Sequence, residues 1–285
     1  MTPLEILLIF LITLGFSGAI PIAKVGLRNS RVEVFTAIYT GGIVFTMFVE
    51  QIIFIPLGHS HVSFGSPALV ILLAGFIGAL GYLSGYGGMK GVHAGISSTV
   101  FNLQGPLILI FGALFTAIIP GKAIIIGLLL SVAGIVLIGA PKFTAGKISF
   151  GIPFILVILA PILWAIEWVS FSSVSARDPV FYTFLLYLTA FVVSAAIALL
   201  RKGLTGATRK MFLYAFSGGA LAGIANASYG IFISSYGTAL TGIVTIISVP
   251  VSVLLVMAVL RERYTITEIV GLVVIGVGLG IALFL

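Results

Sequence analysis

The sequence predicts an all-α integral membrane protein, with ten transmembrane helices arranged as two inverted five-helix repeats around a central cavity. Three observations predict this class. Hydrophobic residues make up 60% of the 285 positions and charged residues 7%, with a mean hydropathy of +1.32, whereas soluble domains carry about 25% charged residues. Apolar runs close to the length of a bilayer span recur along the chain. Prolines and glycines repeat at the same spacing in the two halves.

Ten apolar stretches of helical length follow one another, separated by short loops. They are expected at 4–24, 33–56, 67–89, 94–118, 121–140, 151–172, 180–200, 211–234, 238–260 and 265–285. The first stretch is too long for a signal-peptide core and lacks a basic leader, so we expect it to remain as a span. The segment from Pro141 to Lys147 separates a first repeat, 1–141, from a second repeat, 148–285, within one membrane domain.

A shift of 144 positions relates the last two spans of each half. It superposes Pro106 on Pro250, Gly127 on Gly271, Gly134 on Gly278, Val100 on Val244 and Leu128 on Leu272. The two glycines of each half are seven residues apart, which is two helical turns, so they share one helix face. Two copies of a five-span unit must insert with opposite orientations. This gives an inverted repeat, which is common in transporters whose substrate site lies at the repeat interface.

The charges of the loops predict that both termini are external. If the N-terminus lies on one side, only Lys122 and Arg177 of the 14 basic residues share that side, and the other 12 lie opposite. Those 12 are Lys24, Arg28, Arg31, Lys90, Lys142, Lys147, Arg201, Lys202, Arg209, Lys210, Arg261 and Arg263. The positive-inside rule makes their side cytoplasmic. The basic residues are scattered in short loops, so we expect no nucleic-acid partner.

The last two spans carry Pro250, then Leu260-Arg261-Glu262-Arg263, then Gly271 and Gly278. This order resembles the Pro, Gly-Glu-Arg and Gly-x6-Gly pattern of the EamA-type branch of the drug/metabolite transporter superfamily. Gly15, Ser17 and Lys24 resemble the polar end of its first span, and Leu163-Trp164-Ala165 the start of its second half. Leu14 stands where the family often has Trp, and Ile118 where it often has Glu. The resemblance implies a ten-span carrier and points to amino-acid export.

Glu167 is the acidic residue predicted to lie deepest in the membrane. It follows Trp164 in span six, on the order of 9 Å from the midplane at 1.5 Å per residue. A carboxylate there costs about 2.5–3.5 kcal/mol on insertion scales, so it should face the bundle interior or a wet cavity. We expect it to bind a substrate ammonium or to accept a proton. The alternative is a structural pair or a carboxylate that reaches the outer interface.

Aromatic and proline residues mark the same spans. Trp164 and Trp168 lie four apart beside Glu167, where an aromatic pair can hold a cation or an aromatic side chain. The alternative is an aromatic belt at the interface. Pro21 and Pro161 interrupt spans one and six and free a carbonyl one turn back, so they are candidate gating bends or static kinks. Lys24, near the cytoplasmic end of span one, joins them as a gating candidate.

Neutral polar residues complete the candidate substrate site. They are Ser17, Tyr82, Tyr86, Asn102, Asn226 and Tyr229. Asn102 is mid-span, so its amide must find partners. Tyr82 and Tyr86, and likewise Asn226 and Tyr229, lie on shared helix faces. Each side chain could line a pathway, or it could pack between helices with its polar end hydrogen-bonded.

These residues predict a secondary transporter that exports amino acids or related zwitterions by alternating access. The alternatives are a carrier of phosphorylated or sugar-linked metabolites, and a membrane-embedded enzyme. No basic residue lies near the middle of a span, which disfavours a phosphorylated cargo. Acids, histidines and a nucleophile do not cluster, so we expect no enzyme activity. With no cysteine we expect no thiolate metal site, and we expect no metal or cofactor. The expected partners are a small-molecule substrate and the lipid bilayer of the cell membrane, with the chain as a monomer or homodimer.

Overall fold

The computed structural model describes residues 2–28, 30–57, 60, 64–92, 94–116, 121–144, 151–175, 178–201, 203, 205–260 and 265–284. Every regular element in these ranges is a helix. They are α1 (Pro3–Leu27), α2 (Val32–Phe54), α3 (Ser66–Gly91), α4 (Ala94–Phe101), α5 (Gln104–Thr116), α6 (Lys122–Thr144), α7 (Ile152–Ser172), α8 (Pro179–Leu200), α9 (Arg209–Leu260) and α10 (Ile266–Phe284). The turn at 261–264 lies outside the described residues, as do Ile118, Lys147, Arg177 and Lys202.

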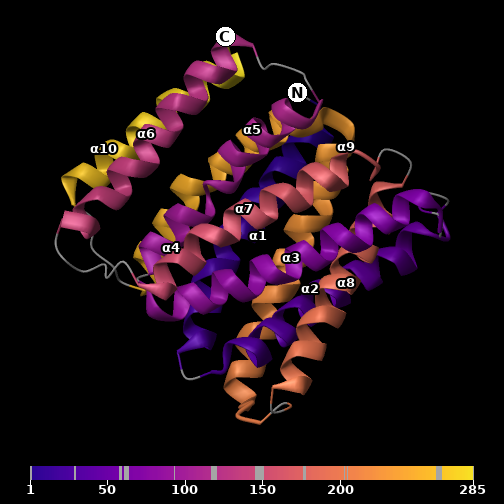
Figure 1. Cartoon of the computed structure of the whole chain (residues 1–285). Helices are drawn as coiled ribbons and strands as arrows, with labels where there is room; N and C mark the ends of the chain where they lie inside the picture. The colour runs from indigo at the N-terminus through magenta and orange to yellow at the C-terminus, as the bar shows by residue number, and fades with distance from the viewer. Residues whose placement is uncertain are drawn as a thin grey trace.

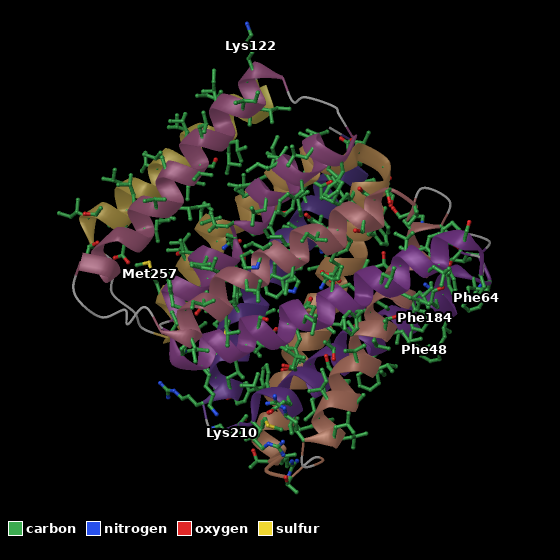
Figure 2. All side chains as sticks on the ribbon, in the orientation of Figure 1. Phe48, Phe64, Lys122, Phe184, Lys210 and Met257 are labelled. Carbon is green, nitrogen blue, oxygen red and sulfur yellow. The ribbon has the colours of Figure 1, made fainter. Side chains whose placement is uncertain are left out.

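Seven helical segments in the described ranges are long and apolar enough to cross a membrane by length and composition. Shorter apolar helices occur within α6 and α10. The predicted all-α class of long apolar helices is therefore confirmed. Many large apolar side chains are exposed, including Phe48 and Phe64 at the edge of the molecule (Figure 2). An outer surface of this kind suits contact with lipid.

Local sequence explains where several helices begin. Thr2 and Glu5 form a capping box at the start of α1, in which the Thr2 hydroxyl accepts from the Glu5 N–H and the Glu5 carboxylate accepts from the Thr2 N–H. Thr265 and Glu268 repeat this arrangement at the start of α10. At α8 the Asp178 carboxylate accepts from the Phe181 N–H at 2.9 Å, with a proline at the next position.

Two regions differ from the predicted span pattern. The stretch expected as one span at 94–118 is divided into α4 and α5, with Asn102 and Leu103 in a turn between them. The two spans expected at 211–234 and 238–260 are joined without a loop as α9, whose backbone breaks at Gly237 with φ +76° and ψ 178°. Hydropathy reports only burial in lipid, so it identifies neither a turn within an apolar run nor a helix junction without polar residues.

The helices pack as neighbours far apart in sequence. α1 lies along α9, α3 lies along α7, and α2 contacts both α8 and α9. α6 and α10 lie side by side at the edge of the bundle (Figure 1). α6 continues through Thr144 into the segment expected to separate the repeats.

The four glycines of the predicted repeat meet across the α6–α10 contact. A Cβ atom on Gly134 would lie 2.5 Å from the Gly271 carbonyl oxygen, and one on Gly271 would lie 2.6 Å from the Gly134 carbonyl oxygen. Gly127 and Gly278 approach each other in the same reciprocal way. The shift of 144 positions aligns Gly127 with Gly271 and Gly134 with Gly278. In the structure the contacts are crossed: Gly127 meets Gly278, and Gly134 meets Gly271. Only a residue without a Cβ permits this approach of backbones.

One end of the bundle is rich in basic residues. α1, α3 and α8 end there, and α2 and α9 begin there, with Lys24, Lys90, Arg31, Arg201 and Arg209 among its side chains. We refer to it as the basic end. Lys122 lies at the opposite end from Lys210, and the start of α1 and the end of α10 also lie away from Lys210 (Figures 1 and 2).

Candidate functional site

A cavity lies between α1, α2, α3, α7, α8, α9 and the turn that separates α4 from α5. The cavity has a volume of about 80 Å³. Its lining residues are Phe16, Ala19, Ile20, Tyr39, Tyr82, Tyr86, Met89, Phe101, Asn102, Gln104, Trp164, Trp168, Tyr187, Ala222, Asn226 and Thr245. This volume lies below the ~300–1,000 Å³ of typical small-molecule sites, so a ligand of that size requires the wall residues to move apart. Among these lining residues none carries a formal charge.

Aromatic rings form half of this lining. The rings of Tyr82 and Trp164 have centroids 5.3 Å apart, and Phe101 meets Trp164 edge-on at 5.1 Å. Tyr39 meets Tyr86 edge-on at 4.9 Å, and both of these rings also adjoin Tyr82. Rings at such distances and angles hold one another in place and expose both faces and edges to a ligand. The wall therefore suits an apolar or aromatic group.

Hydroxyl and amide groups form a short chain on the wall. The Tyr187 hydroxyl donates to Asn226 Oδ1 at 2.7 Å, and the Tyr82 hydroxyl lies 3.4 Å from that of Tyr187, at the long limit for such a bond. Asn226 Nδ2 donates to the Ala222 carbonyl one turn earlier at 2.8 Å. These bonds fix the amide of Asn226 in one orientation. Its position is thereby suited to recognise a polar ligand group.

Asn102 lines the cavity at the break between α4 and α5. Its side-chain Nδ2 donates to the Ser98 carbonyl at 2.8 Å, and its backbone N–H reaches the same carbonyl at 3.2 Å. An asparagine amide that competes with the backbone in this way favours helix ends over helix interiors. The expectation that this mid-span amide needs partners is confirmed, and one partner is the end of its own helix.

Glu167 is fully buried but is not among the lining residues. Its carboxyl group occupies the space that a Cβ atom on Gly78 would need, so it packs against the backbone of α3. Neither carboxyl oxygen has a hydrogen-bond partner among the described residues. Trp164, one turn earlier on α7, packs in the same way against Gly81. An ionised carboxylate in such surroundings is costly, so the group requires a proton or a cationic ligand.

The other two candidates, Ser17 and Tyr229, lie behind the cavity wall. The Ser17 hydroxyl donates to the Ser248 carbonyl at 3.0 Å and accepts from Ser252 at 3.1 Å, which joins α1 to α9. The Tyr229 ring meets Trp168 edge-on at 4.5 Å, and its hydroxyl bonds to Thr245 at 3.0 Å. Tyr229 therefore supports two lining residues. Of the nine candidates, the structure brings six to the cavity: Tyr82, Tyr86, Asn102, Trp164, Trp168 and Asn226.

Lys24 joins the ends of α1 and α3 beside the cavity. Its ammonium donates to the carbonyls of Met89, a lining residue, and Val92 at 2.5 and 2.6 Å. Lys90 makes the reverse connection to the Ser30 carbonyl at 2.8 Å. A cation bound to the last carbonyls of a helix also complements its dipole. Pro21 and Pro161 are buried inside α1 and α7, and both helices continue through them.

Sequence reasoning missed Phe16, Tyr39, Phe101 and Tyr187 on the cavity wall. Tyr39, in the second predicted span, lies on the wall. The available signal was a tyrosine in the middle of an apolar span, where the hydroxyl needs a polar partner. Tyr39 and Tyr187 both fit that description. Within the part of the chain that the structure describes, no three His, Cys, Asp or Glu residues gather as metal ligands.

Comparison with known proteins identifies the fold but no family. No family model matches the chain, and no curated protein matches it. Among solved structures, one described as "Crystal structure of protein" superposes with a TM-score of 0.75 over 97% of this chain and 95% of that chain. The two sequences are 19% identical. At this identity the likeness establishes a shared fold over nearly the full length of both chains.

Proposed function

We propose that the chain is a secondary transporter of the cell membrane that exports amino acids or related zwitterions by alternating access. The cavity carries this proposal, because its aromatic walls, fixed amides and adjoining buried acid suit a small molecule with an apolar part and opposite charges. The rings would hold the side chain of such a solute. Asn226, Asn102 and the Tyr187 hydroxyl would hydrogen-bond its carboxylate and ammonium ends.

Ten spans in two inverted halves form the architecture of the proposed transporter. α4 and α5 together count as one span and α9 as two, separated at Gly237. The reciprocal contacts of Gly127 with Gly278 and of Gly134 with Gly271 support the inverted relation, because a two-fold axis between α6 and α10 would exchange such pairs. The cavity would then lie at the interface of the halves, where transporters of this type bind substrate.

Glu167 is the proposed acidic group of the site. It lies one helical turn from Trp164 and next to Trp168, both lining residues. From its place against Gly78 it would reach the cavity by a rotation of its side chain. There it would bind the substrate ammonium, or hold a proton that leaves when substrate arrives. In either case the charge of the buried carboxyl is balanced only when a cation or proton is present.

Lys24 is the proposed gate at the basic end. Its bonds to Met89 and Val92 close the space between α1 and α3, and Pro21 lies one turn before it in α1. Opening toward the basic end would require these bonds to break. The free carbonyl that each proline leaves gives α1 and α7 a place to bend.

A phosphorylated cargo is the weaker candidate. Phosphate groups are bound in proteins mainly by Arg or Lys side chains and helix N-termini. The lining residues of the described cavity include neither Arg nor Lys, and the nearest cation, Lys24, is bound to two carbonyls. A neutral, aromatic wall favours a zwitterion whose charges balance within the molecule.

Counterflow in proteoliposomes tests the proposal. Purified chain is reconstituted with an unlabelled amino acid inside, and entry of the labelled amino acid is measured for each of the twenty. We expect accelerated exchange for amino acids with aromatic or large apolar side chains, and a reduced rate for Glu167→Gln. An enzyme would change the labelled compound, and a scaffold would neither exchange nor change it. Exchange of phosphorylated anions alone, or full activity of Glu167→Gln at every pH, would contradict the assignment.

A further inference from the structure

We propose that the outer face formed by α2, α8 and α9 binds one anionic phospholipid, with an acyl chain in an apolar groove and the phosphate on basic side chains at its end. This site is separate from the central cavity and does not depend on the transport proposal. The groove is lined by Ala37, Ile38, Gly41, Phe45, Phe191, Ala195, Leu199, Phe212 and Phe216. Every side chain among them is a hydrocarbon.

The groove runs from the basic end toward the middle of the bundle. On α2 its lining extends from Ala37 to Phe45, and on α8 from Leu199 back to Phe191. Eight residues of helix correspond to about 12 Å. One leaflet of the hydrocarbon core is about 15 Å thick. The groove is therefore about as long as the part of one acyl chain that a single leaflet contains.

The lining of this groove combines small residues with aromatic rings. Gly41 lets the Phe191 ring approach, because a Cβ atom there would lie 3.2 Å from it. Phe216 stacks on Phe212 with centroids 5.6 Å apart and lies 5.4 Å from Phe45. Such a shape accommodates a flexible hydrocarbon chain along its length, and it lies on the surface that faces lipid.

Positive charge gathers where the groove reaches the basic end. Arg209 lies three residues before Phe212 and seven before Phe216, so all three share one face of α9. Lys210 adjoins it, and Arg201 follows Leu199 by two positions. With Arg31 and Glu33 the cluster has four positive charges and one negative, a net charge of +3. A phosphate at this point would meet the charge of opposite sign.

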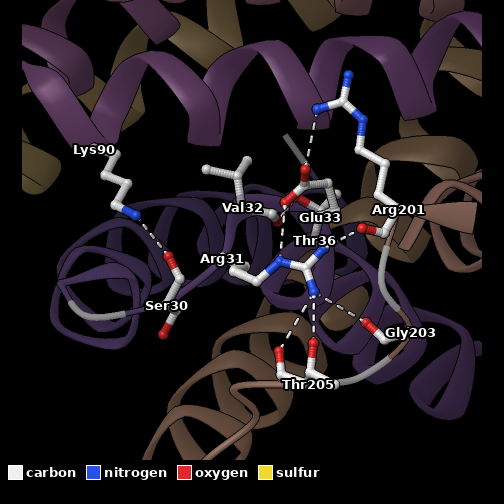
Figure 3. A network of polar contacts seen from close by, with 9 residues as sticks. All are labelled: Ser30, Arg31, Val32, Glu33, Thr36, Lys90, Arg201, Gly203 and Thr205. Carbon is white, nitrogen blue, oxygen red and sulfur yellow. Dashed lines mark hydrogen bonds and ion pairs between the residues drawn. The ribbon is translucent and has the colours of Figure 1, made fainter. Parts of the chain in front are cut away.

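Two of the four cations in the cluster bind other parts of the protein, and the other two are exposed. The Arg31 guanidinium donates to the Gly203 carbonyl and to Thr205 Oγ1, and Arg201 pairs with Glu33 at 3.1 Å (Figure 3). These bonds fix the connection between α8 and α9. Arg209 and Lys210 are exposed and form no ion pair within the described residues. They are the cations positioned to meet a lipid phosphate.

The charge also favours a lipid over a second copy of the chain. Two copies in one membrane, related by a two-fold axis along its normal, would bring the same patch of each together. Both basic clusters would then lie at one level and repel each other. An anionic phospholipid supplies hydrocarbon for the groove and negative charge for its end.

Native mass spectrometry of the detergent-purified full chain tests this site with dioleoylphosphatidylglycerol and dioleoylphosphatidylcholine. We expect the first phosphatidylglycerol to bind about tenfold more tightly than phosphatidylcholine. Ala195→Phe fills the groove and should weaken phosphatidylglycerol binding at least fivefold. Its control is Ala196→Phe, at the next and exposed position, which does not line the groove. Thermal unfolding of each variant checks that it is folded.

Charge variants test the headgroup contact separately. Arg209→Gln with Lys210→Gln should bring the ratio of the two lipid affinities close to one, and Lys122→Gln at the opposite end should leave it unchanged. Equal affinity of the wild type for both lipids would overturn the proposal. A wild-type dimer that Ala195→Phe dissociates would assign the groove to a second copy instead. An effect of the charge variant together with none of Ala195→Phe would show headgroup attraction without a groove site, and would also overturn it.

Discussion

At the scale of single residues, the buried carboxyl of Glu167 depends on a missing side chain. Glycine at position 78 leaves the space that the carboxyl fills, and Gly81 does the same for the Trp164 ring. The spacing of these two glycines on α3 matches the spacing of their partners on α7. A methyl group at either position would therefore move a residue of the candidate site.

Gly78→Ala should lower the free energy of unfolding by about 1–3 kcal/mol, because the added methyl group meets the Glu167 carboxyl. In a Glu167→Ala background the obstacle is absent, and the same change should cost less than about 0.5 kcal/mol. Thermal unfolding in detergent measures all four forms of this cycle. Gly276→Ala, where a Cβ would meet nothing within 4 Å, is the control. Additive effects of the two changes would contradict the packing.

Tyr187→Phe should lower the affinity for the transported solute about 2- to 10-fold, the equivalent of ~0.5–1.5 kcal/mol for one hydrogen bond. The hydroxyl that fixes Asn226 is lost, so the amide no longer faces the cavity in one orientation. Tyr182→Phe on the same helix, off the cavity wall, should leave the affinity unchanged. Half-saturation in the counterflow assay measures both. An equal loss in the two variants would indicate a general effect on α8.

The sequence could predict residues of the cavity wall where a side chain with a polar tip lies within an apolar span. Asn102, Asn226 and Trp164 are polar-tipped residues within apolar spans, and all three lie on the cavity wall. Tyr229 satisfies the same description yet lies behind the wall, because helix rotation decides which side of a span meets the cavity. Rotation is set by close approaches such as those of α3 and α7. A single sequence does not reveal which glycines make them.

At the scale of elements, the break within α9 replaces a loop. Gly237 adopts φ +76° and ψ 178°, a conformation that is essentially restricted to glycine. It lets one apolar helix reverse direction into the next without polar residues. Hydropathy therefore indicated the two apolar stretches and their approximate ends but not the junction between them.

Gly237→Ala should lower the free energy of unfolding by about 1–3 kcal/mol, the cost of holding a residue with a Cβ in that region of backbone space. Gly280→Ala in α10 adds the same methyl group in open space on a regular helix, so it should raise the free energy of unfolding by up to about 1 kcal/mol. Thermal unfolding of the two variants in one detergent gives the comparison. A gain for Gly237→Ala equal to that for Gly280→Ala would mean that the junction tolerates a side chain.

At the scale of the whole molecule, basic side chains distinguish one end of the helix bundle from the other. Lys24, Lys90, Arg31 and Arg201 meet at the basic end, although they come from segments up to 177 positions apart (201 − 24). Their placement matches the loop charges from which the orientation was predicted. The pairing of helices across the halves was beyond the reach of composition, because it depends on contacts between distant residues.

Single-cysteine labelling tests the predicted orientation, and the chain has no cysteine to remove. Thr2→Cys at the start of α1 should react with a membrane-impermeant maleimide in intact cells. Ala207→Cys, exposed at the basic end, should react only after the cells are permeabilised. The reverse pattern would place the basic end outside. Labelling of both positions in a population of intact cells would mean dual insertion.

The pairing of α6 with α10 also sets an order of events during synthesis. α6 is complete at Thr144, but the glycine face that it presents to Gly271 and Gly278 has no partner until α10, which begins at Ile266. The ribosome must add the 121 residues from 145 to 265 in between. At ~5–20 residues per second this takes roughly 6 to 24 s. For that time α6 lies in the bilayer without its main partner, until the 19 residues of α10 are added.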